Sequence, residues 1–142
     1  MENGSPLKVL LVAEGSGGHL IPALQVAGSL ARDGVRIKVW YVQRRQTARL
    51  ARALAEEVGE AVDLDPIPLE PPAGLLGRLW RCGQLWRRAQ RCFDTFAPDI
   101  VVGFGGWASA PVVLAACLRR SRLIGLPWRR DFSRAGRSLR GP

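Results

Sequence analysis

The chain has 142 residues, which is enough for one domain with its own core. Its apolar runs, such as Val9–Ala13 and Val112–Leu118, are far shorter than the roughly 20 residues of a membrane-spanning helix. Residues 1–77 carry eight Lys or Arg and nine Asp or Glu, whereas residues 78–142 carry thirteen Arg and three Asp, giving a net charge of +9. This asymmetry indicates an anionic partner for the second half (nucleic acid, a phosphorylated substrate or anionic lipid), although a merely solvated basic surface has the same composition.

The first part of the chain alternates between apolar runs and helical patterns. Leu7–Ala13 is a continuous apolar run, which predicts a strand buried on both faces. The apolar residues of Leu20–Ala31 fall on one face of a helix, which Gly34 is well placed to end. Ile37–Val42 and Thr47–Val58 predict a second strand and a second helix.

The middle of the chain predicts an edge strand and a long helix. Val62–Leu69 is a weaker strand pattern interrupted by Pro66 and Pro68, which favours the edge of a sheet. After a turn-rich connector, apolar residues recur at spacings of three and four up to Pro98, and this pattern predicts a helix packed on the sheet. The predicted core stripe of this helix consists of Leu75, Leu79, Cys82, Trp86, Ala89, Phe93 and Phe96.

The last elements complete an α/β pattern. Asp99–Phe104 predicts a fourth buried strand, a helix follows to about Leu118, and Arg122–Leu126 predicts a fifth strand. Strands alternating with helices indicate a Rossmann-like parallel sheet with flanking helices, in the strand order 3-2-1-4-5, over residues 7–126. Residues 127–142 are rich in Arg and Gly and predict an irregular segment, either an exposed tail or the product of a frame disruption.

The cysteines and the first residues favour the cytosol. Cys82, Cys92 and Cys117 form no C-x-x-C pair and have no metal-ligand spacing, so we expect reduced thiols and no bound metal. Cys82 and Cys92 are expected to fill apolar positions. Residues 1–5 (MENGS) lack the basic and apolar regions of a secretion signal.

Two glycine-rich segments follow predicted strands at the sheet edge where open α/β sheets bind ligands, next to the reversal of strand order. The first glycine segment, Gly15–His19 (GSGGH), precedes a helix, whose free N–H groups and partial positive charge suit an anion or a sugar phosphate. It is neither a dinucleotide fingerprint nor a P-loop, and a generic turn is the alternative. The second glycine segment, Gly103–Pro111 (GFGGWASAP), also clears space above the sheet.

His19 is the one histidine of the chain and ends the first glycine segment. The start of a helix favours a neutral imidazole, which is the form that a general base needs. Its position is as compatible with a structural role as it is with catalysis or substrate contact.

Taken together, the two segments resemble the N-terminal domain of the MurG family of glycosyltransferases. The resemblance is carried by Gly15–Pro22 (GSGGHLIP) and Asp99–Pro111 (DIVVGFGGWASAP), and it extends from about Leu7 to Leu126. It implies the N-terminal, acceptor-side half of a GT-B fold, with the donor domain absent. The implied reaction is inverting transfer of N-acetylglucosamine from UDP-N-acetylglucosamine to a lipid-linked muramyl-pentapeptide, without cofactor or metal, at the inner face of the cell membrane.

The resemblance also implies roles for individual residues. His19 would be the catalytic base for the acceptor hydroxyl. The residues near the donor would be Ser16, Gly17 and Gly18, and those around the acceptor pyrophosphate would be Gly103, Gly105, Gly106 and Ser109.

The chain departs from the family pattern at several points. Glu14 stands where the family usually has Gly, and it brings a negative charge to a site for phosphates. Trp107 replaces a usual Tyr and Ala110 a usual Gly. Leu126–Arg130 (LPWRR) replaces the family's His-Glu-Gln-Asn segment, so we expect the chain by itself to transfer little or no sugar.

The long helix carries a candidate membrane face. Leu76 and Trp80 lie off the predicted core stripe, on a side shared with Arg87, and such an apolar pair among arginines is typical of binding to an anionic membrane surface. Packing against a further domain or against the tail is the alternative. The arginines expected on the remaining surface of this helix are Arg78, Arg81, Arg88 and Arg91.

Three classes of function follow. The first is a MurG-like transferase domain, and the second is a non-catalytic, membrane-recruiting, acceptor-binding subunit that works with a separate donor-domain chain. The third, nucleic-acid binding, is disfavoured because the basic residues are not interleaved with an aromatic stacking platform. We therefore expect no nucleic-acid partner.

Overall fold

The computed structural model describes residues 5–14, 17–68, 74–119 and 122–125, in which strands and helices alternate. The elements are β1 (Lys8–Ala13), α1 (Gly17–Arg32), β2 (Arg36–Gln43), α2 (Arg45–Val58), the 3-10 helix η1 (Gly59–Ala61), β3 (Val62–Pro68), α3 (Gly74–Thr95), β4 (Ile100–Gly103), α4 (Ser109–Leu118) and β5 (Arg122–Gly125). Residues 127–142, for which an irregular segment is predicted, lie outside the described residues, as does Leu126.

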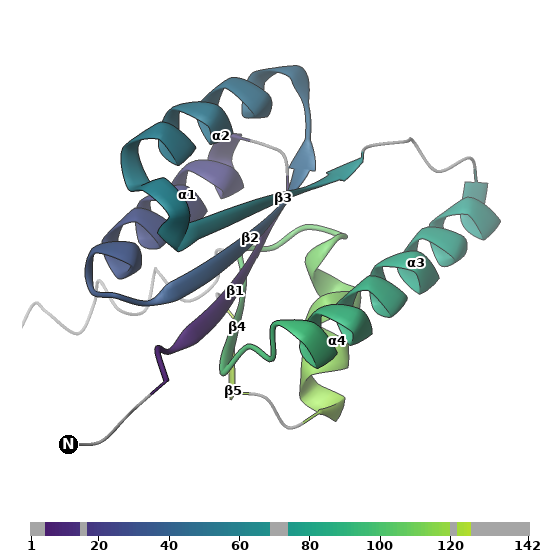
Figure 1. Ribbon diagram of the computed structural model, residues 1–142. Helices are drawn as coiled ribbons and strands as arrows, with labels where there is room; N and C mark the ends of the chain where they lie inside the picture. Colours follow the sequence, from purple (N-terminus) through teal and green to yellow (C-terminus); the bar gives the residue numbers. More distant parts are fainter. Residues whose placement is uncertain (1–4, 15–16, 69–73, 120–121, 126–142) are drawn as a thin grey trace, which may run out of the picture.

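The five strands form one parallel sheet in the order β3-β2-β1-β4-β5 (Figure 1). The predicted Rossmann-like fold and strand order are therefore confirmed. β3 lies at the edge, where Pro66 and Pro68 cost no ladder hydrogen bond on the open side. One boundary matters for the site: α1 begins at Gly17 rather than near Leu20, so residues 17–19 belong to its first turn.

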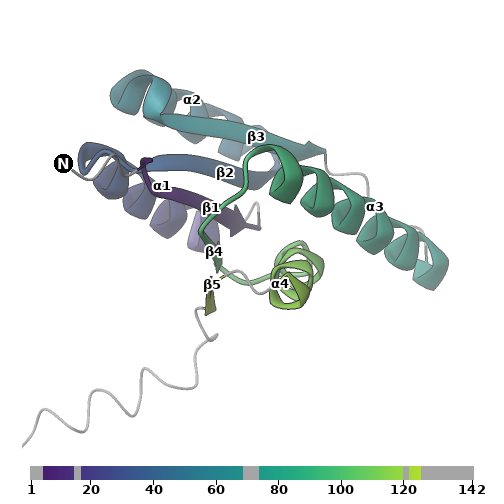
Figure 2. The same cartoon turned by 60° about the horizontal axis from the view of Figure 1, so that its bottom comes forward.

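Two hydrophobic layers explain why the central strands are apolar throughout. Leu11 and Val39 face one layer, with the buried faces of α1 and α2, whereas Leu10 and Trp40 face the other, with α3 and α4. Successive side chains of a strand point to opposite faces, so a strand covered on both sides needs an unbroken apolar run. Figure 2 shows the sheet between these two pairs of helices.

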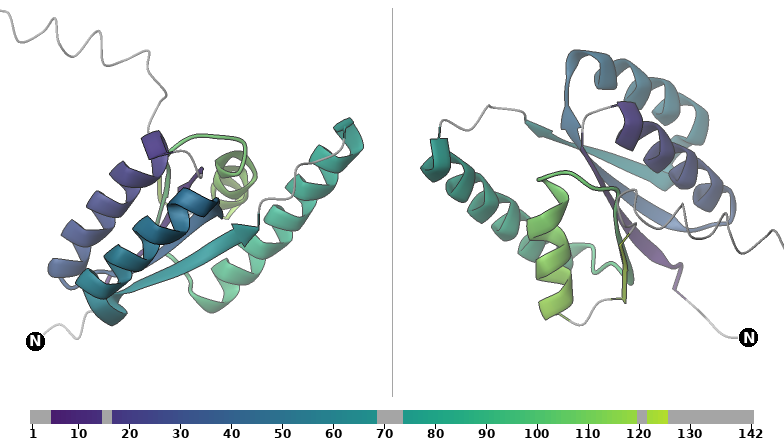
Figure 3. Two further views of the ribbon diagram at one scale, coloured as in Figure 1. Left: turned by 90° about the horizontal axis from the view of Figure 1, so that it is seen from above. Right: turned by 180° about the vertical axis from the view of Figure 1, so that it is seen from behind.

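Helix α3 packs on the sheet only along its C-terminal half. Ala89 and Phe93 are buried as predicted, but Leu75 and Leu79 are 73% and 60% exposed, so their assignment to the core stripe is wrong. The first turns of α3 project past the carboxyl end of β3 (Figures 1 and 3), where none of the described strands lies beneath them. Leu85 is instead the first buried apolar residue of the helix.

Two arginines predicted on the surface of α3 fasten it to the edge strand. Arg81 is buried and donates a hydrogen bond to the Pro68 carbonyl at 3.2 Å, which corrects the prediction of a surface position. Arg88 is half-buried, pairs with Asp65 and stacks on the Trp40 ring, with 5.1 Å from its guanidinium carbon to the ring centroid. These contacts hold the helix beside β3. The spacing of apolar residues could not predict them, because both are made by arginines.

Cys92 shows the packing role predicted for it. It is buried in the layer beneath α3, and desolvation raises the pKa of its thiol to about 11, with smaller effects from nearby charges. A thiol that stays protonated at neutral pH is a filler of apolar space rather than a nucleophile.

Candidate functional site

The two glycine segments leave the sheet side by side. β1 and β4 are neighbours at the centre of the sheet, where strand order reverses, and Val12 pairs with Gly103. The Phe104 N–H extends this pairing by donating to the Val12 carbonyl at 2.9 Å. Because both strands are parallel, the chain after Ala13 and the chain after Gly103 emerge at the same carboxyl edge.

The first glycine segment opens α1. Gly15 and Ser16 lie outside the described residues, whereas Gly17 and Gly18 form the start of the helix, where backbone N–H groups have no partner within the helix. A Cβ placed on Gly18 would meet no atom within 4 Å. The space above this residue is therefore open, as the approach of a ligand to the backbone requires.

The second glycine segment is tightly packed. Gly103 lies in β4 against α4, and a Cβ on it would come within 3.1 Å of Val113 Cγ2. Gly105 and Gly106 turn the chain with φ of 93° and 88°, which other residues rarely adopt. The Ser109 hydroxyl donates to the Gly105 carbonyl at 2.7 Å and so closes this turn, while its contact with a ligand stays a prediction.

Glu14 lies close to a residue of each glycine segment. It follows the last residue of β1, and its Oε2 lies 4.0 Å from Nδ1 of His19, with the two side chains 21% and 12% exposed. Glu14 also lies against Gly106, where a Cβ would come within 2.6 Å of the Glu14 Cβ. The sequence marks Glu14 only as a departure from a family pattern, and its contact with a distant glycine depends on the fold.

A small cavity connects the second glycine segment to α3. It has a volume of about 90 Å³ and lies between Trp107, the end of β3 and the helix. Its lining consists of Ile67, Pro68, Arg81, Gln84, Leu85, Arg88 and Trp107. The segment that carries the predicted acceptor contacts thus reaches the helix that carries the predicted membrane face.

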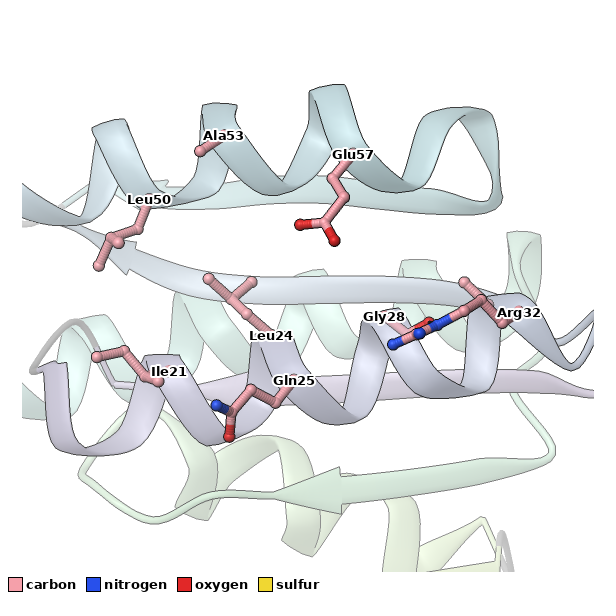
Figure 4. Close-up of a pocket in the computed structure, with 9 residues that line it drawn as sticks. Ile21, Leu24, Gln25, Gly28, Arg32, Leu50, Ala53 and Glu57 are labelled. Atoms are coloured by element: carbon pink, nitrogen blue, oxygen red, sulfur yellow. The ribbon is translucent and has the colours of Figure 1, made fainter.

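A wider groove of about 640 Å³ lies elsewhere, between α1 and α2 (Figure 4). Leu24 forms part of it from α1, and Glu57 points toward it from α2. None of its lining residues belongs to a glycine segment. The sequence did not predict this groove, because it arises from the spacing of two helices.

The first turns of α3 expose a group of large apolar side chains, which we call the α3 patch. It comprises Leu75, Leu76, Leu79 and Trp80, which are 73%, 82%, 60% and 63% exposed. Arg87 is also exposed on this helix, as are Arg78 and Arg91. The predicted pair of Leu76 and Trp80 therefore belongs to a larger exposed surface than the sequence indicated.

The described residues contain neither a membrane-spanning helix nor a cluster of possible metal ligands. None of the helices in these residues combines the length and the apolar character needed to cross a bilayer. Among the same residues, no three His, Cys, Asp or Glu side chains are grouped so that they could hold a metal ion.

Comparison with known proteins agrees with this geometry. The model of the glycosyltransferase family 28 N-terminal domain matches residues 9–124. The UDP-N-acetylglucosamine–N-acetylmuramyl-(pentapeptide) pyrophosphoryl-undecaprenol N-acetylglucosamine transferase of Chromohalobacter salexigens is 36% identical over 117 residues, covering 82% of this chain and 32% of the relative. The enzyme of the same name from Mycobacterium sp. (strain KMS) is 41% identical over 128 residues, covering 85% of this chain and 32% of the relative.

Solved structures show the same fold. MurG of Acinetobacter baumannii matches with a TM-score of 0.60 at 23% identity, over 84% of this chain and 35% of that one. UDP-GlcNAc 2-epimerase of Neisseria meningitidis, bound to UDP-GlcNAc, also matches with a TM-score of 0.60, at 18% identity over 89% of this chain and 35% of that one. The chain thus spans about a third of the length of these relatives.

Proposed function

The chain belongs to the family of the glycosyltransferase family 28 N-terminal domain, and from this we propose that it is the acceptor-side half of an N-acetylglucosaminyltransferase of peptidoglycan synthesis. The acceptor would be the lipid-linked muramyl-pentapeptide and the donor UDP-N-acetylglucosamine, with no resident cofactor. The observation that carries the proposal is the meeting of two glycine segments at the carboxyl ends of β1 and β4, where Val12 pairs with Gly103 and His19 lies in the first turn of α1.

The proposed reaction is a single inverting displacement. The muramyl 4-hydroxyl oxygen attacks the anomeric carbon of the donor, the bond from that carbon to the diphosphate oxygen breaks, and UDP leaves with the electron pair. The hydroxyl proton passes to His19, which acts as the general base. The start of α1 supports this assignment because its free N–H groups suit a diphosphate, and the open space above Gly18 lets the substrate approach.

In this proposal the first glycine segment contacts the donor and the second contacts the acceptor. Residues 16–18 serve the donor, although Ser16 itself lies outside the described residues. Residues 103–109 serve the acceptor pyrophosphate. The positive φ of Gly105 and Gly106 supports the second role because it turns the backbone sharply beside the first segment.

The α3 patch supports a place on the cytoplasmic face of the cell membrane. Its four large apolar side chains are exposed at a helix end, with Arg78 and Arg87 exposed on the same helix. Apolar side chains of this kind enter the headgroup region of a bilayer, and each nearby arginine adds about 1 kcal/mol on an anionic surface.

A second candidate function is a non-catalytic acceptor-binding subunit that requires a separate donor-domain chain. It is favoured by one feature of the sequence: the segment Leu126–Arg130 lacks the His-Glu-Gln-Asn motif expected there.

A fused protein tests the leading proposal. Residues 1–125 are joined to the part of the Chromohalobacter salexigens transferase that this chain does not match, and transfer of labelled N-acetylglucosamine to the lipid-linked acceptor is measured. We expect transfer by the fused protein, and a loss of about 100-fold or more for His19→Ala, the usual scale for a general base. A folded fused protein that binds the donor and transfers nothing would overturn the proposal.

Mixing the two parts as separate chains distinguishes the two candidate functions. Transfer in the mixture at a rate near that of the fused protein would favour the two-chain subunit. Transfer by the fused protein alone would favour a domain of a single enzyme.

A further inference from the structure

Glu14 lies beside the proposed base, His19, but has no role in the proposed reaction. It stands at the end of β1, five positions before His19, and its side chain is directed between the two glycine segments rather than into bulk water. With 21% of the side chain exposed, the carboxylate is largely withdrawn from solvent. A carboxylate withdrawn in this way is costly unless it interacts with a polar or charged group.

The place of Glu14 depends on Gly106. The backbone of Gly106, at φ 88°, lies so close to Glu14 that a Cβ there would come within 2.6 Å of the Glu14 Cβ and within 2.8 Å of its carboxyl carbon. The backbone of Gly106 therefore restricts the conformations that the Glu14 side chain can adopt. The Glu14 carboxylate thus lies close both to the Gly106 backbone and to the imidazole of His19.

This arrangement bears on which ring nitrogen of His19 carries the proton. The nitrogen nearest to Glu14 is Nδ1, at 4.0 Å from Oε2. A carboxylate on the Nδ1 side favours the tautomer with a proton on Nδ1, and this leaves the lone pair on Nε2. A distance of 4.0 Å is longer than a hydrogen bond, but such contacts are often long without substrate and shorten when the substrate binds.

We propose that Glu14 is a positioning residue for His19: its carboxylate, confined by Gly106, keeps the proton on Nδ1 and directs Nε2 toward the acceptor hydroxyl. The inference rests on the proposed function of His19 as the base. During transfer the hydroxyl proton moves to Nε2, the Nδ1 proton stays between ring and carboxylate, and the negative charge of Glu14 stabilises the imidazolium. Glu14 itself neither gains nor loses a proton.

The tautomer of His19 can be measured without any sugar transfer. Because the chain has a single histidine, the imidazole nitrogen signals of the full 15N-labelled chain belong to His19 without further assignment. Spectra are taken at about pH 8.5, above the usual titration range of imidazole. We expect the Nδ1–H tautomer in the wild type and a shift to mainly Nε2–H in Glu14→Met, which keeps the length of the side chain and removes its strong acceptor oxygens.

Two further variants make the outcome specific. Glu14→Gln keeps the volume of the side chain but adds an N–H donor that can face Nδ1, so it should weaken the preference for the Nδ1–H tautomer. Glu60→Met removes an exposed glutamate of η1, at the opposite end of the sheet, and should leave the nitrogen signals unchanged. The same tautomer in the wild type and in Glu14→Met would overturn the inference.

The fused protein separates this inference from the proposed function. There, Glu14→Met should lower the transfer rate by at least about tenfold with little change in acceptor KM, since it disturbs the base and not the binding surface. If the fused wild-type protein transferred nothing, the proposed function would fail, while the tautomer result would still decide the role of Glu14. A tautomer that changes in Glu14→Met with an unchanged transfer rate would remove the catalytic part of the inference.

Discussion

The two glycine segments look alike in sequence, yet the fold uses them in opposite ways. In the second segment, Gly103 and Gly106 are needed by the protein itself, because neighbouring atoms fill the space where a side chain would be. In the first segment, Gly18 faces open space, and no part of the described structure requires the absence of a side chain there. Glycine in the second segment thus serves the fold, whereas at Gly18 the described structure leaves open space that the proposed donor can enter.

Glycines in a binding motif can therefore be distinguished by whether the fold sterically requires them. A glycine that is sterically required reports on close packing or on a positive φ, and its substitution disturbs stability and binding together. A glycine that the fold does not require either lies beside a bound ligand or simply faces solvent, and only in the first case does its substitution disturb binding without a loss of stability. Single alanine substitutions test whether the fold requires each glycine, and the expected changes in the free energy of unfolding differ widely among them.

The largest effect is expected for Gly106→Ala. The new methyl group would collide with Glu14, and φ 88° is unfavourable for alanine, so the free energy of unfolding should fall by at least about 2 kcal/mol. Urea unfolding followed by circular dichroism measures this loss. The double variant with Glu14→Gly should recover the part caused by the collision, and a loss that is the same with and without Glu14 would show that the two residues do not touch.

A smaller loss is expected for Gly103→Ala. Its φ is ordinary, but the methyl group would come within 3.1 Å of Val113 Cγ2, and such overpacking costs about 1–2 kcal/mol. The same unfolding experiment applies. Shortening the neighbour with Val113→Ala should relieve most of the loss, and an additive result would contradict the close approach of β4 and α4.

Gly18→Ala should leave the fold intact or stabilise it slightly. The methyl group meets no atom within 4 Å, and alanine is favoured over glycine in a helix, so a gain of about 0.5 kcal/mol is expected. In the fused protein, the same variant should raise the KM for the donor by about tenfold, because the methyl group occupies the path of the diphosphate. A KM equal to that of the wild type would mean that no ligand approaches this residue.

The smallest effect on stability is expected on the α3 patch. Leu76→Ser combined with Trp80→Ser changes two side chains that are 82% and 63% exposed, so the free energy of unfolding should move by less than about 0.5 kcal/mol. Flotation with anionic vesicles should nevertheless show a clear loss of membrane binding. A double substitution of Leu114 and Leu118 to Ser, at residues that are 55% and 67% exposed on α4, is the matched control, and equal flotation of all three proteins would remove the membrane role of the patch.

The order of the strands could be predicted because each strand is a short apolar run and each connection carries a helix pattern. The core stripe of α3 was predicted too far toward its start, since the spacing of Leu75 and Leu79 contains no information on where the sheet beneath the helix ends. Arg81 was predicted on the surface for a related reason: its burial depends on the Pro68 carbonyl at the end of another element.

The candidate site was predictable only in its parts. The motifs identified both glycine segments and His19, and the strand order predicted that the segments would lie at one edge. The position of Glu14 could not be predicted, because it depends on the backbone shape of Gly106, a residue far away in the chain. Contacts that depend on the exact path of two loops are fixed by tertiary structure rather than by local pattern.

The most direct test of the central claim is the response of His19 to the acceptor. The imidazole signals of the full chain are followed by NMR while a water-soluble muramyl-pentapeptide diphosphate with a short prenyl chain is added, and the prenyl diphosphate alone serves as the control. A saturable shift with the complete acceptor, much larger than that with the control, is the predicted result, because His19 lies where the two glycine segments meet. An acceptor that binds, as seen from shifts elsewhere in the protein, and leaves the imidazole signals unchanged would contradict the account.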